Sequence, residues 1–371
     1  MKIGTITFHG SHNYGSMLQA YALQEYVKKL LNSFQIPCDY QIINYRSETQ
    51  TNIYQAPRPG NLKNLVKWLM YLSYKKQLDT QYRKFEDFIT DRLHPTEAFS
   101  HSDRLPEIAS HFDVLIAGSD QIWNVRARDF DIAYLFPECP NKKISYAASL
   151  GPLSINWKNY HPEKYSNLLK NFSSVSVREE KSYEMLREIL PEKHVEILPD
   201  PTFLLDEHAW RKIQSDMNLG KYILFYCLEP SKEHIRIAKL LSKKIGLPVV
   251  ATKYRNKNDY FNPFIKQYDA GPCDFLSLAD HAAVVLTSSF HGTVFSLIYG
   301  KPFYVINGME DGRIRDILKL FGAEKNNLPF GIQDVEPPLA VRNTESVIRC
   351  EQEKARAYLT AALGLSIAGG R

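Results

Sequence analysis

The sequence predicts an α/β protein made of two Rossmann-like halves that face each other across a cleft. Short β-branched runs alternate with helical stretches, and this alternation begins anew near Lys221 after an interruption. The length of 371 residues also exceeds what one hydrophobic core usually spans. Alternating strands and helices form parallel sheets with right-handed crossovers, so we expect one such sheet in each half.

The first half is predicted to open with a strand, a helix and a second strand. A β-branched run covers residues 2–8, and apolar residues then recur at three- and four-residue steps over 17–31, as in a helix. A basic, aromatic helical region over 62–88 interrupts the rhythm. Further strands are expected at 40–45, 113–117, 143–148, 174–177 and 195–198.

The second half repeats the pattern. A strand over 221–227 is followed by a helix over 235–245 that should end at Gly246, because glycine is a common helix stop. A strand over 282–287 then leads through the turn S-S-F-H-G into another helix. The predicted domains are an N-terminal domain over 1–210 with a helical insertion near 60–95, a C-terminal domain over 211–330, and a tail over 331–371 whose helix packs back.

Composition narrows the classes of function. A net charge of +5 from 46 basic and 41 acidic residues suits anionic substrates or an acidic membrane surface, but not nucleic acid, which needs basic residues concentrated on one face. The five cysteines lie far apart, without the spacing of a disulfide framework or a zinc site. The N-terminus turns polar too early for a signal peptide, and no stretch has the length of a membrane span. We expect a reduced, cytoplasmic, soluble protein without a bound metal.

The strongest local motif is T-S-S-F-H-G-T, residues 287–293, between a strand and a helix. Ligands bind α/β sheets at such strand ends, and the helix start suits an anion. Ser288 and Ser289 are expected to cap the helix, and Gly292 to let a ligand approach the backbone. His291 would donate to a phosphate or move a proton. The other interpretation is a serine-capped helix with an incidental histidine.

A second motif, A-G-S-D-Q-I-W-N, follows the strand over 113–117. Asp120 and Gln121 would hold sugar hydroxyls, and Trp123 would offer an apolar face to a sugar ring. The alternative is a capped turn with a core tryptophan. At the end of the first strand, Asn13 and Tyr14 stand at another helix start and extend this predicted acceptor site.

Two arginines are predicted to bind anions. Arg178 ends the segment S-V-R-E, and a buried arginine needs a negative partner. Its planar fork suits a carboxylate or a phosphate, while the alternative is a structural ion pair with Glu179 or Glu180. Arg313 follows the S-S-F-H-G unit, in D-G-R-I-R.

Seven segments, in order along the chain, resemble the polysaccharide pyruvyl transferase family. They run from Gly4 to about Ile306 and read G-T-I-T-F-H-G-S-H-N-Y-G-S-M-L-Q-A-Y-A-L, F-D-V-L-I-A-G-S-D-Q-I-W-N, S-Y-A-A-S-L-G, V-S-V-R-E, L-P-D-P-T-F-L-L, S-S-F-H-G-T and G-K-P-F-Y-V-I. The family histidine falls on His291, and the arginine of its S-V-R-E segment falls on Arg178. Many members carry arginine two positions before that histidine, where this chain has Ser289. Arg313 resembles a later family arginine that would supply the charge.

The resemblance implies a fold similar to two-domain (GT-B-like) glycosyltransferases. It also implies transfer of a pyruvyl group from phosphoenolpyruvate, a co-substrate and not a bound cofactor, to hydroxyls of a sugar in a bacterial surface polysaccharide or its lipid-linked precursor. The expected donor-binding residues are Arg178, Arg313, Ser288, Ser289 and Gly292. His291 would transfer a proton or stabilise phosphate, and Asp120 would orient the acceptor.

Two rival functions remain open. A nucleotide-sugar glycosyltransferase of the same architecture would want an acidic residue for the donor ribose, and no such motif stands out after Tyr222. A non-catalytic sugar- or anion-binding protein is the other rival.

Residues 62–76 read as a basic amphipathic helix with two interpretations. Leucines with Val66 and Met70 form one face, and Lys63, Lys67, Lys75 and Lys76 add charge. Such a helix either rests on the inner face of the plasma membrane or packs on the first domain.

Overall fold

The computed structural model describes residues 1–54, 62–253 and 257–365, and the chain divides into two compact units. Unit 1 consists of Met1–Tyr54, Asp87–Leu205 and Ile348–Arg371, and unit 2 of Gln55–Glu86 and Asp206–Val347. The division falls within two helices, α4 (Lys75–Arg92) and α14 (Thr344–Leu363).

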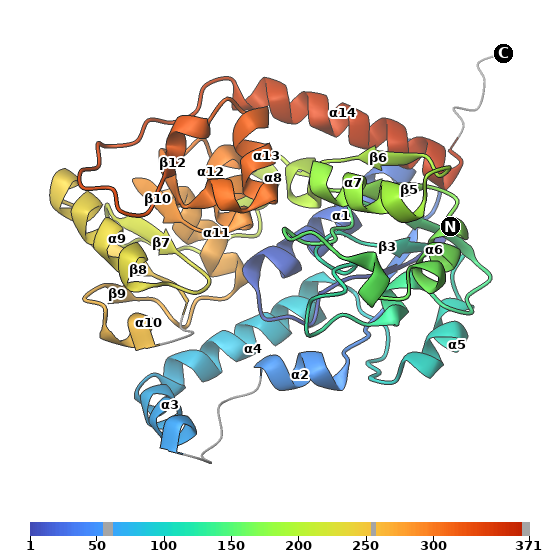
Figure 1. Cartoon of the computed structure of the whole chain (residues 1–371), viewed down its shortest axis with the longest axis horizontal. Coiled ribbons are helices and arrows are strands. Elements are labelled where there is room, and N and C mark those ends of the chain that lie inside the picture. The colour runs from blue at the N-terminus through green and yellow to red at the C-terminus, as the bar shows by residue number, and fades with distance from the viewer. Residues whose placement is uncertain (55–61, 254–256, 366–371) are drawn as a thin grey trace. The chain divides into compact units, whose positions relative to one another are not determined.

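The sheet of unit 1 is parallel throughout (Figure 1). Its order is β2 (Asp39–Ile42), β1 (Lys2–Ile6), β3 (Val114–Ala117) and β4 (Lys142–Ser145). A parallel pair, β5 (Val175–Val177) and β6 (Val195–Ile197), joins the β4 side through the bridges Ile144–Ser174 and Ala148–Val177. From β1 the chain goes first to β2 on one side and then to β3 on the other. The chain order therefore reverses between β1 and β3, which is the topological switch point of this sheet.

In unit 1, a polar side chain fixes the start of the first helix, and the last helix packs on the sheet. Asn13 caps α1 (Tyr14–Ser33) by accepting the Gly15 N–H at 3.0 Å. The last helix, α14, packs on the sheet of unit 1, where the Tyr358 hydroxyl donates to the Ser145 carbonyl at 2.6 Å. The other helical segments of unit 1 are α2 (Glu48–Tyr54), η1 (Ser102–Arg104), α5 (Leu105–Ala109), η2 (Ile132–Leu135), η3 (Trp157–Asn159), α6 (Pro162–Lys170), α7 (Glu180–Ile189) and η4 (Pro201–Leu204).

The sheet of unit 2 is also parallel in every pair. Its order is β12 (Asn327–Leu328), β11 (Phe303–Ile306), β10 (Val284–Thr287), β7 (Ile223–Tyr226), β8 (Val249–Ala251) and β9 (Ile265–Lys266). The chain leaves β7 toward β8 and later returns to β10 on the other side of β7. The switch point of unit 2 therefore lies between β7 and β10.

Strand alternation decides which helix covers which face of this sheet. Ile223 and Phe225 share a core cluster with Ile237 of α9 (Lys232–Ile245). On the opposite face, the Tyr226 ring packs against Phe275 of α11 (Pro272–His281), with ring centroids 4.9 Å apart. The other helical segments of unit 2 are α3 (Leu62–Ser73), α8 (Glu207–Arg211), α10 (Lys257–Phe261), α12 (Phe290–Ile298), η5 (Gly308–Glu310), α13 (Gly312–Leu320) and η6 (Glu324–Asn326).

The helical insertion is where the structure departs most from the predicted domains. Residues 55–86 group with unit 2 and not with the N-terminal domain. The reason is aromatic packing, because Tyr74, between α3 and α4, contacts Tyr260 and Tyr268 with ring centroids 5.6 and 5.1 Å apart. An ion pair adds to this, since Lys84 Nζ lies 2.7 Å from an Asp274 carboxylate oxygen.

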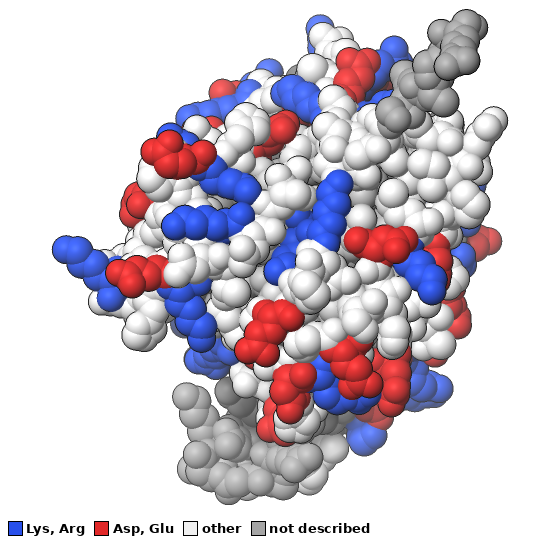
Figure 2. Space-filling model, turned by 90° about the vertical axis from the view of Figure 1, so that its right-hand side faces the viewer, with Lys and Arg blue, Asp and Glu red and all other residues white. Residues whose placement is uncertain are grey.

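Neither sign of charge dominates the face of the molecule drawn in Figure 2. On the face drawn in Figure 2, basic and acidic side chains are interspersed among uncharged residues. No helix in the described part of the chain is both long and apolar enough to cross a membrane.

Candidate functional sites at two sheet switch points

In unit 2, the S-S-F-H-G turn lies at the switch point. Thr287, the last residue of β10, is fully buried and its hydroxyl donates to the Tyr226 carbonyl at the end of β7, at 2.6 Å. The same oxygen accepts the Ser289 N–H at 3.0 Å. This threonine therefore fastens the turn to the neighbouring strand, in the place where α/β sheets bind ligands.

His291 is the second residue of α12 and is only 7% exposed. The edge of its ring packs against Phe290 with centroids 5.0 Å apart. The first turn of α12 has N–H groups that no earlier helical carbonyl can accept, and the helix dipole adds positive potential there. An imidazole and an anion-binding helix start thus occupy the same turn.

Two roles expected of this turn are corrected by the structure. Ser289 stands at the N-cap of α12, but its side chain makes no capping hydrogen bond. A Cβ on Gly292 would lie 2.2 Å from the Thr287 hydroxyl oxygen and 3.1 Å from the Tyr226 ring. The space that this glycine leaves is filled by the strand ends, so its small size serves helix–strand packing and not the approach of a ligand.

Arg313 reaches the same region from α13. Its guanidinium carbon lies 5.9 Å from the centroid of the Phe290 ring, next to His291. It is held by a bidentate ion pair with Asp311, whose carboxylate accepts at 3.0 and 2.6 Å. The side chain is 14% exposed, so this arginine combines fixed geometry with access to solvent. The structure thus brings Arg313 and His291 to the same phenyl ring, that of Phe290.

The switch point of unit 2 also contains a buried thiol, that of Cys227. Cys227 follows β7, and burial raises the pKa of its thiol to about 12, although a hydrogen bond with Ser288 lowers it in part. We expect iodoacetamide at pH 8 to alkylate the exposed Cys350 and leave Cys227 unmodified, because the thiolate is the reactive form. Peptide mass mapping of the native protein tests this. Modification of Cys227 at the rate of Cys350 would contradict it.

In unit 1, the two N-terminal motifs meet at the switch point between β1 and β3. The Thr7 hydroxyl, just after β1, donates to the Ser119 carbonyl just after β3 at 3.0 Å. Gln19 of α1 donates to the same hydroxyl at 2.8 Å. The turn after β1, the start of α1 and the turn after β3 are therefore joined by buried hydrogen bonds.

Asp120 has a backbone conformation that suggests a constrained role. Its φ is +74°, in the left-handed region, which costs a residue with a side chain about 1–3 kcal/mol. The carboxylate accepts from the Ser16 hydroxyl of α1 and from the Gln121 N–H. It is 7% exposed and lies at the switch point. Strain of this kind is often found where a side chain must point in a fixed direction.

The predicted acceptor site is only partly supported by the placement of its residues. Trp123 is fully buried, donates to the Tyr134 carbonyl at 3.1 Å and packs edge-on against Phe172. It is a core tryptophan, so the prediction that it offers a face to a sugar is wrong. Tyr14 is also fully buried. The half-buried Asn13 and Gln121 remain, the latter accepting from Asn124 at 2.9 Å.

Arg178 lies in a buried ion-pair network in unit 1. Its Nη1 is 2.7 Å from an Asp200 carboxylate oxygen, and its Nε is 3.4 Å from Glu179. Burial alone would lower the pKa of the guanidinium, but the charges of Asp200, Glu179 and Asp120 raise it overall. Its side chain is 2% exposed. This is the structural interpretation that the sequence left open, with Asp200 as the main partner.

Sequence reasoning missed the residues that hold these sites together. Asp200 lies 22 positions after Arg178, within the segment L-P-D-P-T-F-L-L. Its other oxygen accepts from the Thr202 N–H and hydroxyl at 3.0 and 2.7 Å. The available signal was one acidic residue in a segment that is otherwise apolar apart from Thr202. Among the described residues, no three His, Cys, Asp or Glu side chains are grouped so that they could hold a metal ion.

The fold and these sites define a class: an α/β protein of two Rossmann-like units, each with its polar motifs at a sheet switch point. The solved structures that resemble it agree with this class. S. aureus MnaA, solved with UDP, matches at 11% identity and a TM-score of 0.52 over 100% of this chain and 98% of that one. UDP-N-acetylglucosamine 2-epimerase from Rickettsia bellii matches at 11% identity and a TM-score of 0.50 over 95% and 88%. At these identities the likeness concerns the fold alone.

The sequence model of polysaccharide pyruvyl transferases matches residues 13–308, and the chain belongs to this family. The match covers six of the seven resembling segments in full and most of the first. No curated protein matches the chain.

Proposed function

We propose that this protein transfers the pyruvyl group of phosphoenolpyruvate to two hydroxyls of a sugar in a bacterial surface polysaccharide or its lipid-linked precursor. The observation that carries the proposal is the turn at the switch point of unit 2, where His291, the start of α12 and Arg313 come together around Phe290. Family membership indicates the reaction class. We further propose that it acts in the cytoplasm, where its five free cysteines would stay reduced.

The chemistry explains why such a turn is needed. Protonation of the methylene of phosphoenolpyruvate gives a methyl group and makes the adjacent carbon an oxocarbenium-like electrophile. One sugar hydroxyl adds to this carbon, phosphate leaves, and a second hydroxyl closes the ketal. The two hydroxyl protons balance the proton gained by the methyl carbon and the one taken up by phosphate. A proton donor and an anion site must therefore act together.

The residues of unit 2 match the donor half of this chemistry. His291 would deliver the proton or stabilise the departing phosphate, and the first-turn N–H groups of α12 would bind an anionic oxygen. Ser288 and Ser289 offer hydroxyls at the same turn. Arg313 supplies the positive charge that Ser289 lacks relative to many family members.

The residues of unit 1 match the acceptor half. Asp120, in its fixed direction, would orient a sugar hydroxyl and accept its proton. Asn13 and Gln121 border the same switch point and would add hydrogen bonds to the sugar. Arg178 would bind the donor only after its ion pair with Asp200 had opened. Arg313 is therefore the main donor-binding arginine of this proposal.

Replacing Arg313 with lysine should raise the KM for phosphoenolpyruvate about tenfold or more, because lysine keeps the charge but cannot make the bidentate pair with Asp311 that fixes its position. Steady-state kinetics with varied donor measure this. Arg315→Lys is the matched control, since Arg315 lies on the same helix but is 40% exposed, with its Nε 3.9 Å from Asp316. Equal KM values for the two variants would remove Arg313 from the donor site.

The function itself is tested by release of phosphate from phosphoenolpyruvate in the presence of an acceptor glycan. Acceptor-dependent phosphate with a ketal in the product supports the proposal. A glycosyltransferase would instead consume a nucleotide sugar and release a nucleotide. Binding of the glycan without any turnover would indicate the non-catalytic alternative.

A further inference from the structure

Helix α3 of unit 2 exposes its apolar face. Leu65, Val66, Leu69 and Leu72, at steps of one to four residues, are 37%, 50%, 51% and 39% exposed. Side chains at this spacing lie on one side of a helix. In a helix packed on a core, this is the face expected to be buried. The side chains of Leu62, Lys63 and Lys67 lie outside the described residues.

The opposite side of α3 attaches it to unit 2. Trp68 and Tyr71 are half-buried, and the Tyr71 hydroxyl donates to Asp79 at 2.9 Å. At the end of the helix, on the side of Leu69, Ser73 and Tyr260 place their hydroxyl oxygens 3.4 Å apart. Trp68 and Tyr71 are therefore partly covered within unit 2, whereas Leu65, Val66, Leu69 and Leu72 stay exposed. In the structure α3 belongs to unit 2, whereas the sequence's second interpretation packed it on the first domain.

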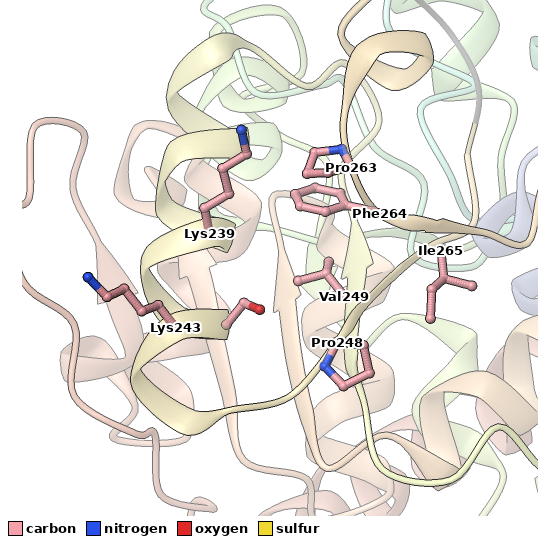
Figure 3. A pocket seen from close by; sticks show the side chains of 8 residues that line it. Lys239, Lys243, Pro248, Val249, Pro263, Phe264 and Ile265 are labelled. Carbon is pink, nitrogen blue, oxygen red and sulfur yellow. The ribbon is translucent and has the colours of Figure 1, made fainter.

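Further apolar side chains are exposed on α10, which contacts α3, and on the edge of the sheet. Phe261, the last residue of α10, is 74% exposed, and Ile265 of the edge strand β9 is 48% exposed. Beside them is a pocket of about 280 Å³ with an apolar wall that includes Phe264 and Ile265. In Figure 3, Lys239 and Lys243 stand on the α9 side of this pocket.

Charge indicates what covers this surface. From Leu62 to Leu78 the sequence has four lysines and no acidic residue. Lys76 is exposed in the first turn of α4, and Lys239 and Lys243 are exposed on α9, at the pocket that Ile265 of β9 also lines. Exposed apolar side chains together with exposed lysines, and with tryptophan and tyrosine on the same helix, match the interface of an anionic bilayer.

We propose that this surface, made by Leu65, Val66, Leu69, Leu72, Lys76, Phe261 and Ile265, docks unit 2 on an anionic lipid bilayer. The leucines and Phe261 enter the headgroup region, and the lysines remain with the lipid phosphates. The proposal extends the proposed function, because a lipid-linked sugar acceptor would be presented at the same bilayer. The docking itself does not require that function.

Flotation on a density gradient tests the docking. The probes are vesicles of neutral phosphatidylcholine, and vesicles in which part of it is replaced by anionic phosphatidylglycerol. We expect the full-length protein to float with the anionic vesicles at low salt, and to bind neutral vesicles at least about tenfold more weakly. High salt should release it.

Matched variants distinguish binding through this surface from nonspecific binding to vesicles. Leu69→Glu combined with Phe261→Glu should weaken binding about tenfold or more, because each places a charge in the apolar contact. Leu339→Glu should float like the wild type, since Leu339 is 75% exposed but lies near β12, at the opposite edge of the same sheet. Equal flotation of the double variant and the wild type would overturn the proposal, as would a wild type that stays at the bottom.

Two further measurements keep the outcomes distinct. If light scattering shows a dimer that the double variant abolishes, a second copy covers this surface and the lipid proposal is overturned. Transfer to a water-soluble acceptor should be unchanged in the double variant, which supports a docking role with an intact fold. A wild type that floats but never releases phosphate would contradict the proposed function and leave the docking supported.

Discussion

His291→Ala is expected to lower turnover by about 10²–10⁴-fold, the usual contribution of a positioned proton donor. The ring stands in the first turn of α12 at the switch point of unit 2, against Phe290. Removing the imidazole leaves the helix and the Thr287 link intact, so we expect only a small change in the melting temperature. Phosphate release under saturating donor and acceptor measures the loss.

His281→Ala is the control for this variant. His281 is the last residue of α11 and comes just before β10, whereas His291 comes just after β10. The two histidines therefore lie at opposite ends of the same strand. It is exposed, and its Nδ1 lies 2.9 Å from the Ser277 carbonyl. We expect wild-type turnover from it. A fully active His291→Ala protein would remove this histidine from the mechanism.

The largest effect on stability is expected from Arg178→Met. Removing one partner of a buried ion pair typically costs about 3–5 kcal/mol, because the remaining charge is left uncompensated. Here the uncompensated groups would be Asp200, with its side chain fully buried, and Glu179 at 2% exposure. Denaturant unfolding followed by circular dichroism measures the change in the free energy of unfolding.

Arg187→Met is the matched control, because Arg187 is exposed on α7 and its Nη1 is 3.4 Å from the Lys193 carbonyl. Its expected change is within about 0.5 kcal/mol. Arg178→Lys adds a second readout, since it keeps the charge but not the fork. If it lowers stability and leaves the donor KM unchanged, the role of Arg178 is structural. A raised KM with unchanged stability would show that it binds the donor.

Much of the fold could be predicted because strands, helices and their stops are local features. The helix over 235–245 does end at Gly246, whose φ of +70° suits glycine. The predicted strand over 282–287 and the helix after it became β10 and α12. Periodicity identifies such elements without any knowledge of their neighbours.

The errors arose where partners distant in sequence decide the outcome. The sequence did not indicate that residues 62–86 group with unit 2, because Tyr74 meets Tyr260 and Tyr268 only in three dimensions. Trp123 allowed two interpretations, a sugar platform or a core residue, and its burial decides for the core residue. Asp200 had no local signal that linked it to Arg178. Spacing identifies which residues carry chemistry, but not which other charges they already contact.

The division of the chain inside α14 has a consequence for biosynthesis. Every residue of unit 2 has been made once Val347 is added, whereas unit 1 still lacks the segment that begins at Ile348. Tyr358 in that segment bonds to Ser145, 213 residues earlier. Domains usually complete themselves from the N-terminus as synthesis proceeds. In this chain unit 1 is the first to begin and the last to be completed. Its sheet therefore stays uncovered by α14 until the residues of that helix have left the ribosome.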